Sequence, residues 1–275
     1  ELNMALSIGT NNSALQAAAA ASSVNRSMET SMERLSTGKR INSASDDAAG
    51  VAISSRLSSE VRGTNQSVRN ALDAQALIDS AEGAHKEVEN ILQRMRELAI
   101  QAANGTNNAD DITNLEAEFT AMSKEIERIG ESTSFAGKAL TDADGKTFSF
   151  QVGSATGTQN QITVTINSIM SEHIGGAPAD FQTITLIEAA GLDNLTETNN
   201  AIVAIDLAIK EVNTQRSELG AVSNRLNHTV NNLTNMSTNL SSAQGRIQDA
   251  DFALETTELA KNQILQQAST AMLAQ

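Results

Sequence analysis

The sequence has no cysteine, tryptophan or tyrosine, a single proline and only six phenylalanines in 275 residues. Without cysteine, disulfides and thiolate metal sites are excluded, and cysteine usage indicates no redox compartment. Because bulky aromatic residues are scarce, stability has to come from many small and aliphatic contacts along long elements. This composition favours an elongated chain over a globular one.

Positive charge is also scarce, with 19 Lys and Arg against 33 Asp and Glu and a net charge of −14. Such a chain repels a phosphate backbone, so no nucleic acid partner is expected. No apolar run is long enough to predict a membrane-spanning helix, so no membrane insertion is expected. The N-terminus lacks the basic region and compact apolar run of a secretory signal peptide, which predicts another route for any export.

Two long segments near the ends of the chain contain no charged side chain. Neither Leu2–Asn25 nor Asn262–Gln275 contains a charged residue, and both have apolar residues at helical spacing. Exposed apolar stripes mark association surfaces. Single helices are marginal in water, and ordering them costs about 1–2 kcal/mol per residue. We therefore expect both ends to be disordered in the free chain and helical among other copies.

Long amphipathic helices are predicted in the middle of the chain. Residues 48–103, 112–129 and 194–240 carry apolar side chains at alternating spacings of three and four. Asp110 or Asp111 is predicted to cap the second of these helices. Such seams predict an elongated antiparallel coiled-coil helical bundle. The predicted core residues are Leu57, Val61, Val68, Leu72, Met95, Phe119, Met122, Ile126, Ile205, Ile209, Val212, Leu219, Leu226, Val230 and Leu233.

The pattern changes between Thr141 and Ala190. Phe148–Val152 and Ile162–Ile166 alternate apolar and polar residues on either side of a glycine-containing turn, which predicts a β-hairpin. A short strand at Thr183–Ile187 is predicted to extend it. The predicted fold is thus mainly α, with a small β-hairpin insert.

Patterns for catalysis or metal binding are weak. His85, His173 and His228 have no carboxylates at ligand spacing, so surface or interface positions are favoured over a metal site. Asp142–Gly145 resembles the start of a calcium loop, but no glutamate closes the frame, which favours a turn. No catalytic residues, metal ligands or cofactors are predicted, and the chain is not expected to be an enzyme.

Several long motifs carry a family resemblance. Glu33–Gly50 (ERLSTGKRINSASDDAAG) and Gln93–Ala103 (QRMRELAIQAA) resemble the N-terminal signature of bacterial flagellins. Arg216–Arg225 (RSELGAVSNR), Arg246–Phe252 (RIQDADF) and Gln263–Gln267 (QILQQ) resemble the C-terminal signature, in the family order. The resemblance implies a structural subunit that polymerises into the extracellular flagellar filament for motility. It is to the short flagellins, which have inner-tube and rod domains and no large outer domains.

The resemblance also implies an organisation into domains. Residues 4–47 and 244–275 are expected to form terminal inner-tube helices with spokes, residues 48–140 and 191–243 a helical rod domain, and residues 141–190 its β-hairpin insert. Met4 aligns with the family's initiator methionine, so residues 1–3 are expected to be a cloning remnant or an extension. The chain stops before the apolar tail of the family, so a shortened tube helix is expected. Expected inner-tube contacts are Leu6, Leu15, Val24, Met28, Leu35, Leu254, Leu259, Ile264, Leu265 and Met272.

Partners follow from the same resemblance. They are further copies of the chain, the flagellar export chaperone at the C-terminal region, and the filament cap and hook–filament junction proteins, with export by the flagellar type III system. Gln93, Arg94, Leu98 and Glu118 resemble the patch that Toll-like receptor 5 recognises on this family. Because that face is also expected to contact other subunits, the receptor is expected to bind the monomer alone.

Two other functions fit parts of the pattern. A hook–filament junction protein belongs to the same superfamily, although the QRMRELA and RSELGAV motifs favour flagellin. A secreted helical module that binds glycans or receptors as a monomer would share the heptad seams. Only a polymerising subunit is expected to form filaments at raised concentration.

Overall fold

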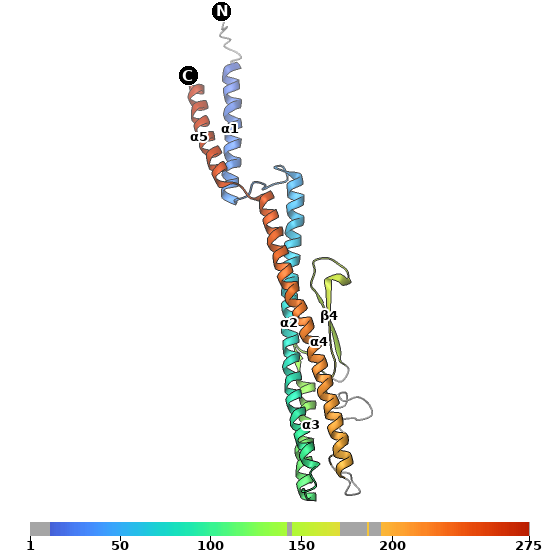
Figure 1. Cartoon of the computed structure of the whole chain (residues 1–275). Helices are drawn as coiled ribbons and strands as arrows, with labels where there is room; N and C mark the ends of the chain where they lie inside the picture. Colours follow the sequence, from blue (N-terminus) through green and yellow to red (C-terminus); the bar gives the residue numbers. More distant parts are fainter. Residues whose placement is uncertain (1–11, 142–144, 171–185, 187–193, 275) are drawn as a thin grey trace, which may run out of the picture. The chain divides into compact units, whose positions relative to one another are not determined.

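A computed structural model describes residues 12–141, 145–170, 186 and 194–274. The secondary structure confirms a mainly α fold with a small antiparallel hairpin (Figure 1). The helices are α1 (Asn12–Thr37), α2 (Ala48–Ala102), α3 (Ala109–Ser132), α4 (Asn194–Gln248) and α5 (Phe252–Ala274). The strands are β1 (Ser134–Phe135), β2 (Lys138–Ala139), β3 (Lys146–Gln151) and β4 (Gln161–Ile166), with a 3₁₀ turn at Thr158–Asn160 before β4.

The chain divides into two compact units. Residues 1–62 and 236–275 form one, here called the terminal unit, and residues 63–235 form the other, here called the central unit. The division therefore lies within α2 and α4, whereas the sequence placed the rod boundaries after residues 47 and 243. The start of α2 belongs to the terminal unit because it contacts the end of α4 there: Ser54 Oγ donates to Gln248 Oε1 at 3.1 Å.

In the central unit, α2 and α4 run antiparallel. Arg96 of α2 pairs with Asp206 at 2.6 Å, and His85, earlier in α2, contacts Gln215, later in α4. α3 packs against both helices around a core that includes Met95, Phe119 and Ile205. Of the predicted core residues, eight are buried: Met95, Phe119, Ile126, Ile205, Val212, Leu219, Leu226 and Leu233. Six are half-buried: Leu57, Val61, Val68, Met122, Ile209 and Val230.

The prediction of a core position for Leu72 was wrong, because its side chain is 48% exposed. The buried residues at this turn of α2 are its neighbours Ala71 and Ala74. They pack in one cluster with Val164 and Ile166 of the hairpin. Small side chains let the sheet approach the helix closely, and one step along a helix turns a side chain by about 100° away from that contact.

The β-hairpin forms where the alternating pattern predicted it. β3 and β4 pair antiparallel, with Phe148 opposite Val164 and Phe150 opposite Ile162. Ile162, Val164 and Ile166 are buried while the residues between them are exposed, as period-two alternation requires. Of the strand predicted at Thr183–Ile187, only Leu186 is described; it lies in a bend and is buried, and the other residues lie outside the described part.

Two local features differ from the sequence-based expectations. The N-cap of α3 is Asn108, which accepts from Asp111 N at 2.8 Å, while Asp111 Oδ2 accepts from Asn108 N at 3.1 Å. Asp111 is thus the second member of a capping box and not the cap itself. The small hairpin of β1 and β2 was not predicted; its turn has positive φ at Ala136 (50°) and Gly137 (80°), as in a type I′ turn.

Candidate assembly surface

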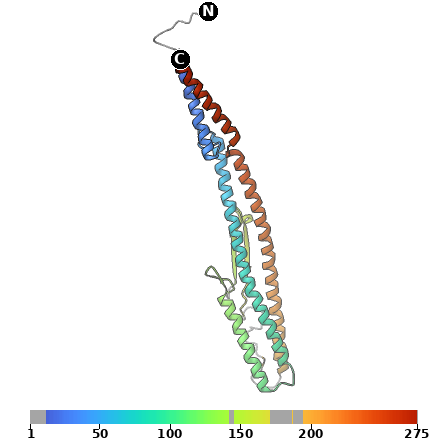
Figure 2. The ribbon, with the colours of Figure 1, turned by 90° about the vertical axis from the view of Figure 1, so that its left-hand side faces the viewer.

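The candidate site lies on α1 and α5, which run side by side and antiparallel in the terminal unit (Figures 1 and 2). Gln266 Nε2 donates to Asn25 Oδ1 at 2.7 Å. Arg34 Nη1 donates to Glu255 Oε1 at 2.9 Å. These two pairs, one towards each end of the contact, define how the helices face each other.

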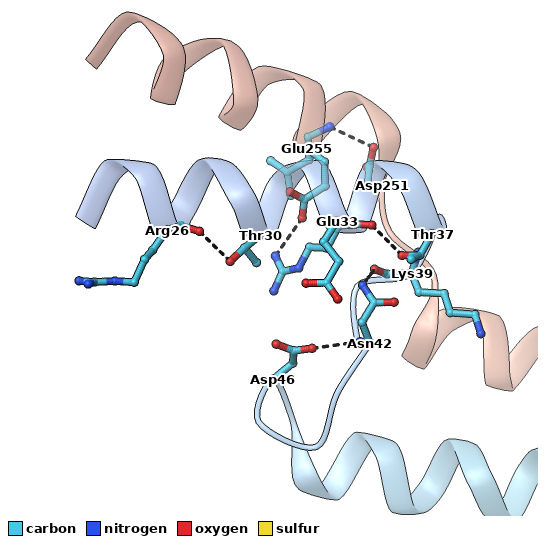
Figure 3. A network of polar contacts seen from close by, with 11 residues as sticks. Arg26, Thr30, Glu33, Thr37, Lys39, Asn42, Asp46, Asp251 and Glu255 are labelled. Atoms are coloured by element: carbon cyan, nitrogen blue, oxygen red, sulfur yellow. Dashed lines mark hydrogen bonds and ion pairs between the residues drawn. The ribbon is translucent and has the colours of Figure 1, made fainter. Parts of the chain in front are cut away.

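Capping residues determine where the two helices meet. α1 is followed by Gly38, whose φ of 69° is left-handed and whose N donates to Arg34 O at 2.9 Å, as in a glycine C-cap. α5 is preceded by Asp251, whose Oδ1 accepts from Ala253 N at 2.9 Å and from Leu254 N at 3.2 Å. Figure 3 shows Asp251 beside Glu255 at this end of α5.

The segments after α1 and before α5 are tied together by backbone hydrogen bonds. Arg40 N donates to Gln248 O at 2.7 Å, and Ala250 N donates to Gly38 O at 3.0 Å. The Arg40 guanidinium also donates to Ile247 O at 2.8 Å. This pairing positions the end of α1 beside the start of α5.

Hydrogen bonds to two aspartates fix the loop between α1 and α2, and Figure 3 shows one of them at Asp46. Asp46 Oδ2 accepts from Ser43 N at 2.8 Å and from Asn42 N at 3.0 Å. These backbone donors, that of Ser43 first, lower the pKa of Asp46 below its ordinary value. Asp47 Oδ1 accepts from Gly50 N at 2.8 Å and so caps α2. The loop leaves its apolar residue, Ile41, buried.

Polar side chains are fully buried on α1 and α5, whereas the large apolar side chains described there are half-buried or exposed. Among the side chains that the structure describes on these two helices, the fully buried ones are polar: Ser31, Glu255, Asn262 and Ser269. Large apolar side chains are exposed instead, Ile264 to 67%. The exposed set is Leu15, Met32, Phe252, Leu254, Ile264 and Leu265. No element of the described chain covers these side chains, so they are available for contacts with other copies.

Most of the predicted inner-tube residues lie on this helix pair. Leu15, Leu254, Ile264 and Leu265 are exposed, whereas Val24, Met28, Leu35 and Leu259 are half-buried. Leu6 and the side chain of Met272 lie outside the described part. Met32 and Phe252 are exposed in the same way but were not among the predicted contacts, although Phe252 belongs to the RIQDADF motif.

The second predicted patch, at Gln93, Arg94, Leu98 and Glu118, is only partly on the surface. Arg94 bridges α2 and α3: Nη2 lies 3.1 Å from Glu118 Oε1, and Nη1 lies 2.9 Å from Glu97 Oε2. Gln93 is exposed as well. Leu98 is only 1% exposed and packs in the core, so its assignment to a surface patch was wrong.

The described residues include no group of three or more His, Asp or Glu side chains that could hold a metal ion. His85, predicted at a surface or interface, is fully buried between α2 and α4, and this expectation was wrong. His228 is exposed, and His173 lies outside the described residues. None of the described helices combines the length and hydropathy that a bilayer crossing requires.

One polar hollow of about 490 Å³ lies in the terminal unit. Its lining includes four serines of α2 together with Lys39 and Arg62. Ligand pockets are mostly apolar with a few convergent polar groups. The hollow therefore does not resemble a small-molecule site.

Comparison with known proteins agrees with the geometry. Residues 8–145 match the family model of the bacterial flagellin N-terminal helical region, and residues 202–275 match that of the C-terminal helical region. A flagellin of Halalkalibacterium halodurans is 44% identical, over 89% of this chain and 86% of the relative. A flagellin of Bacillus subtilis is 42% identical, over 92% and 90%. The structure of a putative flagellar hook-associated protein from Vibrio parahaemolyticus, 17% identical, has a similar fold, with a TM-score of 0.61 over 74% of this chain and 100% of the other.

Proposed function

Since this chain belongs to the bacterial flagellin family and is a structural subunit of the flagellar filament, we propose that α1 and α5 form the inner tube of that filament. The exposed apolar side chains of α1 and α5 are then the polymerisation contacts. Residues 48–140 and 191–243 form the surrounding rod layer, with residues 141–190 as its insert. The observation that supports this proposal best is that six large apolar side chains of α1 and α5 are exposed, while the fully buried residues described on these helices are polar.

The energy of assembly follows from that surface. Six large apolar side chains of α1 and α5 are exposed in the single chain. These side chains are already about half covered, so their burial between copies adds about 1 kcal/mol each and supplies about 6 kcal/mol per subunit. Within one chain the described helix pair fully buries only polar side chains, and its apolar Val24, Met28, Leu35 and Leu259 are half-buried. The terminal helices are thus expected to gain their full order in the polymer.

The test is the substitution Leu265→Asp. It places a charge on a surface that becomes dry in the filament, so it should abolish sedimentable filaments while helical circular dichroism is retained. Gln267→Asp is the matched control, because Gln267 is an exposed polar residue of the same helix. Normal filaments from Leu265→Asp in electron micrographs would reject the proposed inner-tube role of this surface.

Before assembly, the same surface needs protection. We propose that the chain is exported by the flagellar type III system with a chaperone bound at the C-terminal region, and that it contacts the filament cap and hook–filament junction proteins at the filament ends. The exposed Leu254, Ile264 and Leu265 support a chaperone site on α5. A purified chaperone that binds Leu265→Asp as tightly as the parent would contradict this site.

We further propose that the monomer is a ligand of Toll-like receptor 5 through Gln93, Arg94 and Glu118. The exposure of these three residues supports a receptor contact. Leu98 would act only indirectly, by packing beneath them. The alternatives are a junction protein, with the hook-associated fold, and a monomeric binding module; a chain that stays monomeric at high concentration would favour the latter.

A further inference from the structure

Among the described residues, the contact between α1 and α5 contains an ion pair in which Glu255 is buried and Arg34 is partly buried. The side chain of Glu255 is only 8% exposed and that of Arg34 is 30% exposed, with 2.9 Å between Nη1 and Oε1. Arg34 lies in the last turn of α1 and Glu255 in the first turn of α5. Each charge is therefore at the helix end that favours it.

This ion pair is poorly suited to stabilising the chain. Arg34 Nε is buried and has no hydrogen-bond partner among the described residues. Desolvating two charges offsets most of their attraction, and a buried pair is weak evidence for stability. Buried polar groups in paired helices instead specify register, because any other alignment leaves them unpaired.

The rest of the seam offers little resistance to sliding. Its other fully buried residues among those described are Ser31, Asn262 and Ser269, which are small or polar. The apolar Val24, Met28, Leu35 and Leu259 of these helices are only half-buried, so they interlock less than fully buried side chains would. A slip of one helical turn, about 5.4 Å, would separate Arg34 from Glu255 and Asn25 from Gln266. The Glu255 carboxylate would then be buried without its partner.

We propose that the Arg34–Glu255 ion pair is the register lock of the α1–α5 helix pair, and that Asn25–Gln266 assists it. The register sets the heights of Leu15 and Met32 on α1 relative to Leu254 and Ile264 on α5. Those heights determine whether the exposed apolar side chains form one surface that fits the next copy of this chain. Arg34 and Glu255 are thus positioning residues for assembly, and this step rests on the proposed inner-tube role of α1 and α5.

The first test is charge reversal in the full chain. Arg34→Glu and Glu255→Arg should each reduce sedimentable filaments at least about tenfold, because each leaves two like charges together in the seam. The double reversal Arg34→Glu/Glu255→Arg should recover most of the yield. The matched controls are Arg26→Glu and Glu258→Arg, which change the same charges where the side chains contact their own helix, at Ser22 and Lys261. Single reversals that assemble like the controls would overturn the lock.

The second test reads register directly, because the chain has no cysteine to interfere. The pair Asn25→Cys and Gln266→Cys should form a disulfide when the helices are in register. The pair Asn25→Cys and Ser269→Cys should not, because residue 269 lies about 4.5 Å further along α5 than residue 266. In the parent, the disulfide yield of the first pair should exceed that of the second at least tenfold. After either single charge reversal the ratio of the two yields should fall below threefold, and in the double reversal it should recover. An unchanged preference in the single reversals would overturn the lock. Failure of the parent to form filaments would instead reject the inner-tube role, and the disulfide preference in the unassembled chain would still decide the register.

Discussion

His85 Nε2 lies 2.8 Å from Gln215 Oε1, and its Nδ1 lies 2.7 Å from Ala81 O, in a fully buried position between α2 and α4. Gln215 Nε2 is buried with no hydrogen-bond partner among the described residues. A half-turn of the Gln215 amide lets its N–H donate to His85 Nε2 while His85 Nδ1–H donates to Ala81 O. With this orientation of the amide, both ring nitrogens of a neutral His85 have a hydrogen-bond partner.

The first prediction follows from this contact. Gln215→Ala should lower the free energy of unfolding by about 2–3 kcal/mol, because it leaves a buried ring nitrogen unpaired and opens a cavity. Asn213→Ala, at an exposed position of the same helix, should change it by less than about 0.5 kcal/mol. Urea unfolding followed by circular dichroism measures both. Equal effects of the two substitutions would show that the His85–Gln215 contact is not formed.

The second prediction compares two glycines of α2. A Cβ on Gly50 would lie 2.5 Å from Ile41 Cδ1 and 2.5 Å from Asp47 Oδ2, whereas a Cβ on Gly83 meets nothing within 4 Å. Gly50→Ala should therefore destabilise by about 1–3 kcal/mol and displace the loop between α1 and α2. Gly83→Ala should stabilise by about 0.5–1 kcal/mol, because alanine loses less backbone entropy in a helix. Thermal unfolding measures the change in stability of each variant. If both variants were stabilised or both destabilised, the packing of Ile41 under Gly50 would be contradicted.

The third prediction concerns acid. Backbone N–H groups, that of Ser43 and then that of Asn42, lower the pKa of Asp46. A carboxyl whose folded-state pKa is lowered stabilises the fold above its unfolded value of about 3.9, and this contribution is lost as the pH falls through the lower folded-state pKa. Carbon-13 NMR of the Asp46 carboxyl should titrate below the ordinary aspartate range. Asp46→Asn should make the loop more sensitive to protease at neutral pH, and a normal titration midpoint would contradict the hydrogen bonds.

The fourth prediction tests receptor recognition. Arg94→Ala removes the guanidinium that pairs with Glu118 and Glu97, and should weaken binding of the monomer to the receptor ectodomain roughly tenfold or more. Arg128→Ala is the matched control, since Arg128 makes a comparable exposed pair with Glu125. Surface plasmon resonance measures both. Intact, non-shedding filaments should not bind, so equal binding by filaments and monomer would contradict a subunit contact at this face.

Local pattern was sufficient for most of the secondary structure. The spacing of three and four residues predicted α2, α3 and α4, and the alternation of residues 146–166 predicted the hairpin, because both periodicities depend on residues close in sequence. The hairpin of β1 and β2 was missed because its turn places a non-glycine residue, Ala136, at positive φ. Leu72 was misplaced because the burial of that turn depends on a sheet that lies far along the chain.

The candidate site was predicted less completely than the fold. Uncharged ends and the flagellin signatures were sufficient to indicate an assembly surface on the terminal helices. The three–four spacing placed Leu98 on the apolar stripe of α2 with Met95, whereas the family resemblance placed it in a surface patch. Packing with α3 and α4 decides for the core.

By itself, then, the sequence determined the helices, the hairpin and the family, because each rests on spacing or motifs within a few tens of residues. Only the tertiary structure decided that the seam of α1 and α5 is polar, that His85 is buried and that Arg34 meets Glu255 across 221 positions of the chain. The physical reason is that the burial and pairing of a side chain depend on which distant element packs against its face of the helix. Composition and periodicity do not identify that element.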